Sequence, residues 1–127
     1  MSNRAVISSP NAPEALGPYS QAVKVGNTVW CSGQIPLVPE TMEIIAGDIT
    51  AQANQVFKNL AAVAEAAGCS LNNAVKINIS LIDMANFAAV NEVMKTYLEE
   101  PYPARACVQV AGLPKGVAIE VEAILAI

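Results

Sequence analysis

The sequence predicts an α+β fold in which two helices cross one face of a single mixed sheet. Two segments carry apolar residues at helical spacing, and several shorter segments alternate apolar and polar residues as strands do. Their order along the chain is strand, strand, helix, strand, helix, strand, strand. A chain of 127 residues favours one domain, and it can bury a core without disulfides or metals.

The first two predicted strands form a hairpin. Residues 21–25 and 28–32 flank Gly26-Asn27, a two-residue sequence typical of tight hairpin turns. Proline-containing stretches on both sides of the hairpin are expected to be loops, the second with room for a short strand: residues 8–13 and 33–43.

The clearest helix is predicted over residues 48–67. Asp48 or Thr50 can cap its start, and Gly68 can end it in the left-handed conformation. Its apolar face consists of residues that recur at helical spacing: Ala53, Val56, Phe57, Leu60, Val63, Ala64 and Ala67.

The second half of the chain is predicted to add a strand, a helix and two strands. Residues 75–81 alternate as a strand, and a helix follows over residues 86–99 until two prolines end it. Its inner side is expected to carry Phe87, Val90, Met94 and Tyr97. The last two strands are residues 105–110 and 117–127.

The final predicted strand is apolar on both faces. One face carries Val117, Ile119, Val121, Ala123 and Leu125, and the other carries Ala118, Ile124 and Ala126. Strands of this kind belong in a sheet that is buried on both sides. Because two helices can cover only one side, a second copy of the chain is the simplest cover for the other. The low charged fraction of 14%, against about 25% in typical domains, also points to a subunit interface.

Composition excludes several classes of function. The chain has no histidine, which rules out Ser-His-Asp and Cys-His catalysis and imidazole-ligated zinc. Its net charge of -4 argues against nucleic acid and anionic membrane partners. Cys31, Cys69 and Cys107 have neither disulfide nor metal spacing and suit a reducing compartment, the cytoplasm. Residues 1–10 lack the pattern of a signal peptide, and we expect no membrane span.

Charged residues interrupt the last two strands. Alternation places Arg105, Cys107 and Gln109 on one face of their strand, and it places Glu120 and Glu122 together on one face of theirs. Two interpretations are open. The charges form a structural ion pair, or they form an anion site in which Arg105 binds a carboxylate and Glu120 orients or activates water.

Other candidate residues each have an ordinary interpretation. Tyr19 at the start of a strand is usually a packing residue, and Ser32-Gly33 after a strand suits a turn. Asn91 suits a solvated helix face. We expect Cys107 to be an inert strand residue, because no histidine exists to activate its thiol.

Several motifs lie at these positions. They are Gly17-Pro18-Tyr19-Ser20-Gln21-Ala22, Ser32-Gly33-Gln34-Ile35-Pro36, Ala51-Gln52 with Gln55 and Asn59, Phe87-Ala88-Ala89-Val90-Asn91, Pro103-Ala104-Arg105-Ala106-Cys107-Val108, and Leu113-Pro114-Lys115 with Ile119-Glu120-Val121-Glu122-Ala123-Ile124. With them the sequence resembles the RidA family, also called the YjgF family, over nearly the whole chain. The most specific part is Pro-Ala-Arg-x-Cys followed by Leu-Pro and Ile-Glu-x-Glu-Ala. The sequence departs from the common pattern at Met42, where a turn glycine is frequent, and at Tyr102, Ala106 and Gly112.

The resemblance implies a single domain over residues 1–127 with a chorismate-mutase-like fold. It also implies a homotrimer in which the sheets surround a central barrel and three clefts lie between subunits. The implied activity is hydrolysis of enamines and imines such as 2-aminoacrylate to 2-keto acids and ammonia, with no cofactor or metal. Position by position, Arg105 matches the residue that holds the substrate carboxylate and Glu120 the one that positions water. The cleft residues are matched by Tyr19, Ser32, Gly33, Asn91 and Cys107.

Three other functions compete with the imine deaminase. The first is a binding or chaperone-like protein that holds small carboxylates without turnover. The second is an endoribonuclease or translation inhibitor, against which the acidic balance weighs. The third is chorismate mutase activity, which only the fold suggests.

Overall fold

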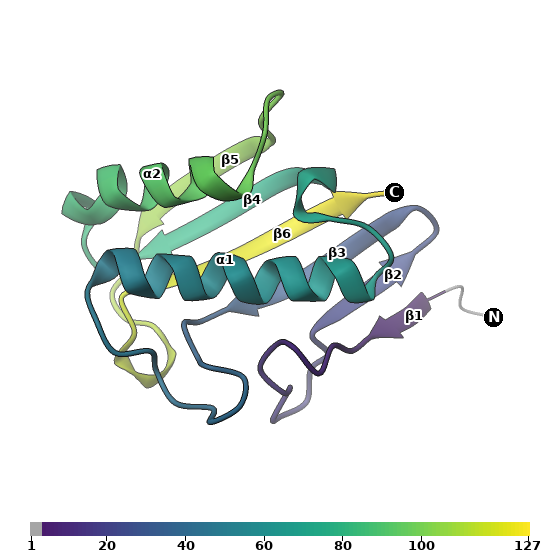
Figure 1. Ribbon diagram of the computed structural model, residues 1–127, viewed down its shortest axis with the longest axis horizontal. Helices are drawn as coiled ribbons and strands as arrows, with labels where there is room; N and C mark the ends of the chain where they lie inside the picture. Colours follow the sequence, from purple (N-terminus) through teal and green to yellow (C-terminus); the bar gives the residue numbers. More distant parts are fainter. Residues whose placement is uncertain (1–3) are drawn as a thin grey trace.

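The computed structural model describes residues 4–127, which form a six-stranded sheet and two α-helices (Figure 1). The strands are β1 (Arg4–Ile7), β2 (Ala22–Val25), β3 (Thr28–Gln34), β4 (Ala74–Leu81), β5 (Ala104–Gln109) and β6 (Ile119–Ala126). Their order across the sheet is β1-β2-β3-β6-β4-β5. Only β4 and β5 pair in parallel, so the sheet is mixed as predicted.

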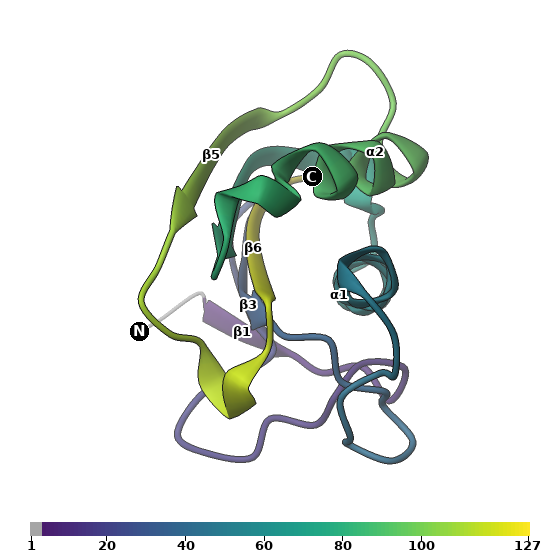
Figure 2. The same cartoon turned by 90° about the vertical axis from the view of Figure 1, so that its left-hand side faces the viewer.

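The two helices lie on the same side of the sheet, as predicted (Figure 2). They are α1 (Ile49–Ala66) and α2 (Phe87–Tyr97), and short 3₁₀ turns occur at η1 (Leu71–Asn73), η2 (Met84–Asn86) and η3 (Pro114–Gly116). Of the two possible caps of α1, Asp48 is the one used, because its carboxylate accepts a hydrogen bond from the Ala51 N–H at 3.1 Å. Gly68 follows the helix with a φ of 87°, the left-handed conformation that glycine favours.

The core lies between the helices and the sheet. The apolar face of α1 buries Phe57, Leu60 and Val63 against alternate residues of the strands. In β6, Ile119, Val121 and Leu125 are completely buried. Burying one such side chain contributes about 1.5–3 kcal/mol to stability, so the β6 alternation firmly fixes which face of the strand points inward.

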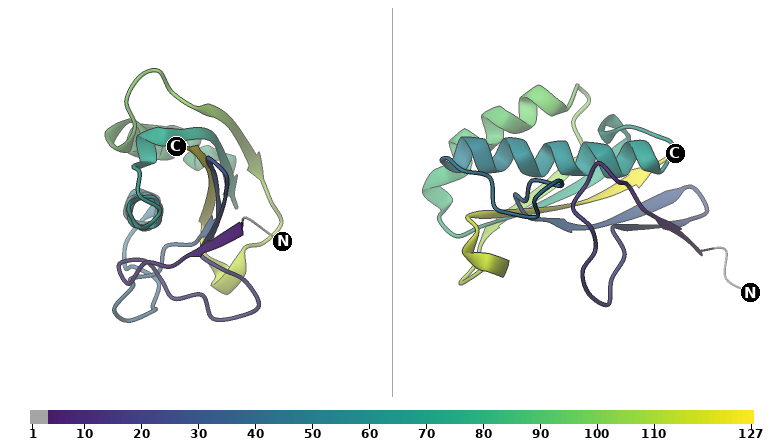
Figure 3. Two further views of the ribbon diagram at one scale, coloured as in Figure 1. Left: turned by 90° about the vertical axis from the view of Figure 1, so that its right-hand side faces the viewer. Right: turned by 60° about the horizontal axis from the view of Figure 1, so that its bottom comes forward.

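Neither α-helix lies over the other face of the sheet (Figure 3). Trp30 of β3 is 52% exposed there, and its cross-strand neighbour Ile124 of β6 is only half-buried. Val6 and Val108 lie on the same face and are also exposed. We call this surface the open face. It carries the second apolar side of β6 that the sequence predicted.

The hairpin turn at Gly26-Asn27 and the loop over residues 8–13 are confirmed. The loop after β3 contains an isolated bridge between Leu37 and Ile44 in place of a full strand. One strand was not predicted: β1 begins at Arg4 and pairs with β2. The alternation predicted over residues 75–81 does not extend to Val75, which is 49% exposed because an irregularity in the pairing with β6 falls between Ala74 and Lys76.

None of the helices in residues 4–127 has the length and apolar character needed to cross a membrane. The expected absence of a signal peptide concerns residues 1–10, of which residues 1–3 lie outside the described part of the chain.

Candidate active site

A pocket of about 420 Å³ opens at the end of the sheet where three loops meet. The loops are the β1–β2 connection, the β3–α1 connection and the η3 turn before β6. Of the predicted site residues, the pocket is lined by Tyr19, Ser32, Gly33 and Glu120. Its other walls are mostly apolar and include Leu16, Ile35, Leu37 and Met42. We call it the Glu120 pocket.

The carboxylate of Glu120 lies directly over Gly33. A Cβ atom at residue 33 would lie 2.9 Å from Glu120 Cδ and 3.0 Å from Oε2, closer than real Cβ contacts. The pairing of β3 with β6 is irregular between Cys31 and Gln34, so Gly33 sits in a bulge of the strand. Residue 33 therefore leaves space for the glutamate, a role that the turn interpretation from sequence did not include.

Burial raises the pKa of Glu120, and the neighbouring Glu122 carboxylate raises it further. The two glutamates share the open face because they alternate along β6. Glu122 is the more exposed of the pair, and its Oε1 accepts a hydrogen bond from Asn78 Nδ2 at 3.0 Å. A carboxyl group with a raised pKa is a better proton acceptor when ionised, as a general base requires.

Hydrogen bonds to backbone groups hold the wall of the Glu120 pocket in place. Ser32 Oγ donates a hydrogen bond to the Ser20 carbonyl at 2.6 Å, and the Ser32 N–H donates to the Gln21 carbonyl at 3.0 Å. The buried Gln21 side chain donates to the Pro13 carbonyl at 2.7 Å and accepts from the Ser9 N–H at 2.6 Å. Tyr19, next to these anchors, is 55% exposed.

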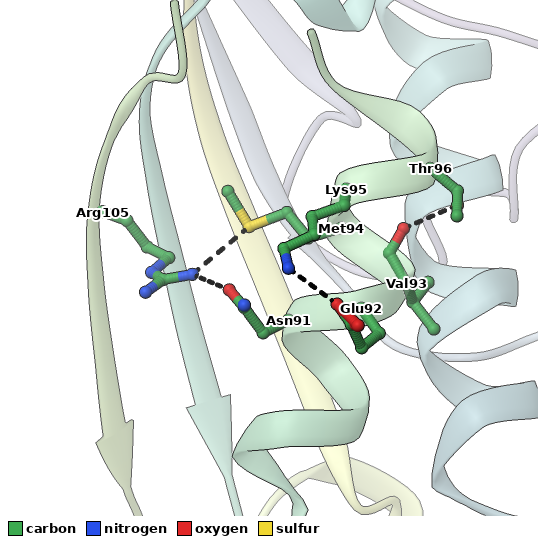
Figure 4. A network of polar contacts seen from close by, with 7 residues as sticks. All are labelled: Asn91, Glu92, Val93, Met94, Lys95, Thr96 and Arg105. Carbon is green, nitrogen blue, oxygen red and sulfur yellow. Dashed lines mark hydrogen bonds and ion pairs between the residues drawn. The ribbon is translucent and has the colours of Figure 1, made fainter. Parts of the chain in front are cut away.

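Arg105 lies in a second pocket, formed by β5 and α2. Its Nη1 donates a hydrogen bond to Asn91 Oδ1 at 2.5 Å and lies 3.9 Å from Met94 Sδ (Figure 4). The guanidinium carbon lies 4.9 Å from the centre of the Phe87 ring, within the range of a cation–π contact. Phe87 and Asn91 are four residues apart on α2, so they share a helix face and together hold the guanidinium. The other N–H groups of the guanidinium remain available to bind an anion.

Cys107 is half-buried beside Arg105 on β5, and its thiol lies 3.9 Å from Met84 Sδ. Burial raises the pKa of Cys107, and the nearby Arg105 only partly opposes this effect. The thiol is therefore largely protonated near neutral pH, which a nucleophile should not be. No cluster of three or more potential metal ligands occurs in residues 4–127.

The structure groups the predicted site residues into two sets. Tyr19, Ser32, Gly33 and Glu120 line one pocket, whereas Asn91 and Arg105 line the other and Cys107 lies next to it. Arg105 pairs with the buried Ile77 and so points to the helix side of the sheet, whereas Glu120 lies between the buried Ile119 and Val121 and points to the open face. In the described part of the chain Arg105 forms no ion pair with Glu120 or Glu122, so the ion-pair interpretation was wrong within one chain.

Sequence reasoning missed two groups of residues at these pockets. Phe87 was placed on the inner side of its helix, yet it stacks on Arg105. The four-residue spacing of Phe87 and Asn91 was the available signal, since it puts both on one helix face. The apolar residues Leu16 and Met42 carry no chemical signal, and only the meeting of distant loops shows that they line the Glu120 pocket.

Comparison with known proteins identifies the family. A family model described as Endoribonuclease L-PSP matches residues 9–127. The 2-iminobutanoate/2-iminopropanoate deaminase of Mus musculus is 49% identical over 121 residues, which are 95% of this chain and 90% of that protein. The protein of the same name from Dermatophagoides farinae is 47% identical over 127 residues, 100% of this chain and 99% of that one.

Solved structures agree with this match. The crystal structure of RidA from the Antarctic bacterium Psychrobacter sp. superimposes with a TM-score of 0.93 at 58% identity, covering 97% of this chain and 99% of that one. Escherichia coli TdcF with bound serine gives a TM-score of 0.91 at 42% identity, covering 97% and 98% of the two chains. The resemblance seen in the motifs is confirmed: this chain belongs to the Endoribonuclease L-PSP family, which is the YjgF/RidA family.

Proposed function

We propose that this protein is an imine deaminase, which hydrolyses 2-imino acids and their enamine forms, such as 2-aminoacrylate, to 2-keto acids and ammonia. The observation that carries the proposal is the nearly full-length match, at 46–49% identity, to proteins named 2-iminobutanoate/2-iminopropanoate deaminase. The site chemistry supports it, because the chain presents an arginine fork and a carboxyl group of raised pKa. The serine bound to TdcF shows that a relative takes a small α-substituted carboxylate.

The active site of this proposal lies between two subunits of a homotrimer. Arg105 and Glu120 point to opposite faces of one sheet, so a single substrate reaches both only if they come from different copies. The exposed apolar residues of the open face, Trp30 among them, support burial against further copies around a central barrel. The free thiols of Cys31, Cys69 and Cys107 suit the cytoplasm as its location.

Each site residue has a proposed role. Arg105 binds the substrate carboxylate through two N–H groups, and Asn91 holds the guanidinium in place. Glu120 positions the water and accepts its proton, in the space that Gly33 provides. Tyr19 and Ser32 line the cleft from one subunit, and Cys107 lines it from the other through its main chain.

The reaction then requires few catalytic groups. An enamine first takes a proton at its terminal carbon and loses one from its nitrogen, which gives the imine. Water adds to the imine carbon while Glu120 takes one proton from it, and the nitrogen receives a proton to give a tetrahedral carbinolamine. Its C–N bond breaks, ammonia leaves with the bonding electrons and a proton, and the C=O bond of the 2-keto acid forms. Fixing the carboxylate supplies the orientation that the uncatalysed reaction lacks.

A coupled assay tests this function. A pyridoxal-phosphate enzyme generates 2-aminoacrylate from serine, and the release of pyruvate is timed with and without this protein. We expect faster release with the wild-type chain and a much weaker acceleration with Arg105→Ala. An unchanged rate with the wild-type chain would refute the proposal. RNA cleavage that weakens as salt rises would instead favour the endoribonuclease named by the family model.

A further inference from the structure

The Glu120 pocket has more apolar wall than the smallest imino acids can contact. Its volume in a single chain is about 420 Å³. In the proposed reaction, the polar residues of the wall face the reacting carbon and the water. The apolar residues Leu16, Ile35, Leu37 and Met42 form another part of the wall, and a three-carbon substrate has only a methyl group to place against them.

Met42 occupies an unusual backbone conformation in this wall. Its φ is 59°, in the left-handed region that favours glycine, and Lys115 with a φ of 57° is the only other non-glycine residue of residues 4–127 with positive φ. Both residues line the Glu120 pocket. Non-glycine residues in this conformation are strained, and such residues cluster at functional sites.

Hydrogen bonds within the loop and from α1 hold the loop that carries Met42. The Met42 N–H donates to the Val38 carbonyl at 2.7 Å, and the Val38 N–H donates to the Glu43 carbonyl at 2.8 Å. On α1, the completely buried Asn59 donates a hydrogen bond from Nδ2 to the Leu37 carbonyl at 2.9 Å and accepts one from Gln55 at 2.9 Å. Met42 is thus presented to the pocket by a supported turn, and its unbranched thioether chain adapts to varied apolar shapes.

We propose that Met42 is a specificity-determining residue, which makes the site favour 2-imino acids with aliphatic side chains longer than a methyl group. This proposal rests on the deaminase function proposed above and names its substrate class. The apolar wall receives the substrate side chain, while the carboxylate and the imine carbon stay near the charged residues. The strained methionine adds apolar contact where a glycine would leave the wall open.

Replacement of Met42 by glycine tests the proposal, because glycine accepts the left-handed backbone and removes only the side chain. Two imines, made in situ by an amino-acid oxidase, are compared: the three-carbon imine from alanine and the six-carbon imine from leucine. One methylene in an apolar pocket changes discrimination about 10-fold or more, so we expect Met42→Gly to lower kcat/KM about tenfold for the six-carbon imine and less than about twofold for the three-carbon imine.

Two further variants complete the experiment. Met42→Leu keeps an apolar side chain and should retain the preference, whereas Thr41→Gly changes the neighbouring exposed residue and should alter neither rate. An equal effect of Met42→Gly on both imines, or no effect on either, would overturn the role of Met42. A wild-type chain that hydrolyses neither imine would overturn the deaminase function itself, so the two failures are distinguishable.

Discussion

Arg105 and Glu120 point to opposite faces of the same sheet. Arg105 lies under α2, where Asn91 and Phe87 hold its guanidinium, and Glu120 lies on the open face over Gly33. Their strands are separated by β4 alone. An anion bound by Arg105 is therefore screened by the sheet from Glu120 of the same chain, which makes the assembly part of the proposed mechanism.

Arg105 is expected to be essential for turnover but not for folding. It is exposed and forms no ion pair with the strand glutamates, so its removal leaves no buried carboxylate unpaired. A charged hydrogen bond contributes about 1.5–3 kcal/mol, so losing it lowers the rate about tenfold to a hundredfold. Arg105→Lys should lose activity as Arg105→Ala does, because lysine lacks the planar fork. Turnover and melting temperature measured on both variants test this. Full activity in Arg105→Ala would end the mechanism.

The pH dependence of kcat/KM should reflect the ionisation of Glu120. As a base it acts only when ionised, and burial together with Glu122 raises its pKa, so kcat/KM should fall on acidification at a higher pH than the ordinary glutamate value of about 4.3. Glu122→Gln removes the like charge and keeps an oxygen for Asn78, so the acid limb should move to lower pH. A profile that does not move in Glu122→Gln would contradict the assignment, and Glu120→Gln serves as the inactive control.

Local patterns were enough to predict most elements of this fold. Helical spacing located α1, and Asp48 and Gly68 marked its ends, because caps depend on residues close in sequence. The strand β1 was missed because four residues without a turn signal become a strand only by pairing with β2, fifteen residues or more along the chain. Such a pairing leaves no periodic trace in a short segment.

The residues that line the two pockets were singled out from the sequence, but their separation into two pockets was not predicted. Alternation correctly grouped Arg105 with Cys107 and Glu120 with Glu122. It could not say which side of the sheet each group faces, because that depends on the parallel register of β5 on β4, in which Arg105 opposes the buried Ile77. A register is a long-range property that a single strand does not carry.

Cys107 is expected to be dispensable for the reaction. Burial raises the pKa of its thiol, so little thiolate is present near neutral pH. Cys107→Ala keeps the main chain of β5 and should keep most of the deaminase rate in the coupled assay. A loss as large as that of Arg105→Ala would point to thiol chemistry, and Cys107→Ser would then show whether a polar atom or the sulfur is required.

Trp30 should anchor the assembly on the open face. This residue is 52% exposed and neighbours Ile124 and Val23 across the sheet. An interface tryptophan typically contributes about 2 kcal/mol or more, and a carboxylate in its place would be buried without a partner. We expect the wild type to sediment as a trimer and Trp30→Asp as a monomer without activity. Thr50→Asp adds the same charge to the exposed start of α1 and should leave the trimer intact. A trimeric Trp30→Asp would place the interface elsewhere.

Mixing two inactive variants gives the most direct test of a shared site. Arg105→Ala lacks the anion fork but keeps Glu120, and Glu120→Gln lacks the base but keeps Arg105. If the two groups meet across an interface, a mixed trimer contains clefts formed by one intact arginine and one intact glutamate. Random mixing of equal amounts gives such a cleft at about one interface in four for a cyclic trimer, so about a quarter of the wild-type rate should return after joint unfolding and refolding. Each variant refolded alone is the control and should stay inactive. A site made within one chain predicts no recovery in the mixture, because every chain would then lack one of the two groups. The recovered fraction therefore decides whether the substrate lies between subunits, as the opposite orientations of Arg105 and Glu120 require.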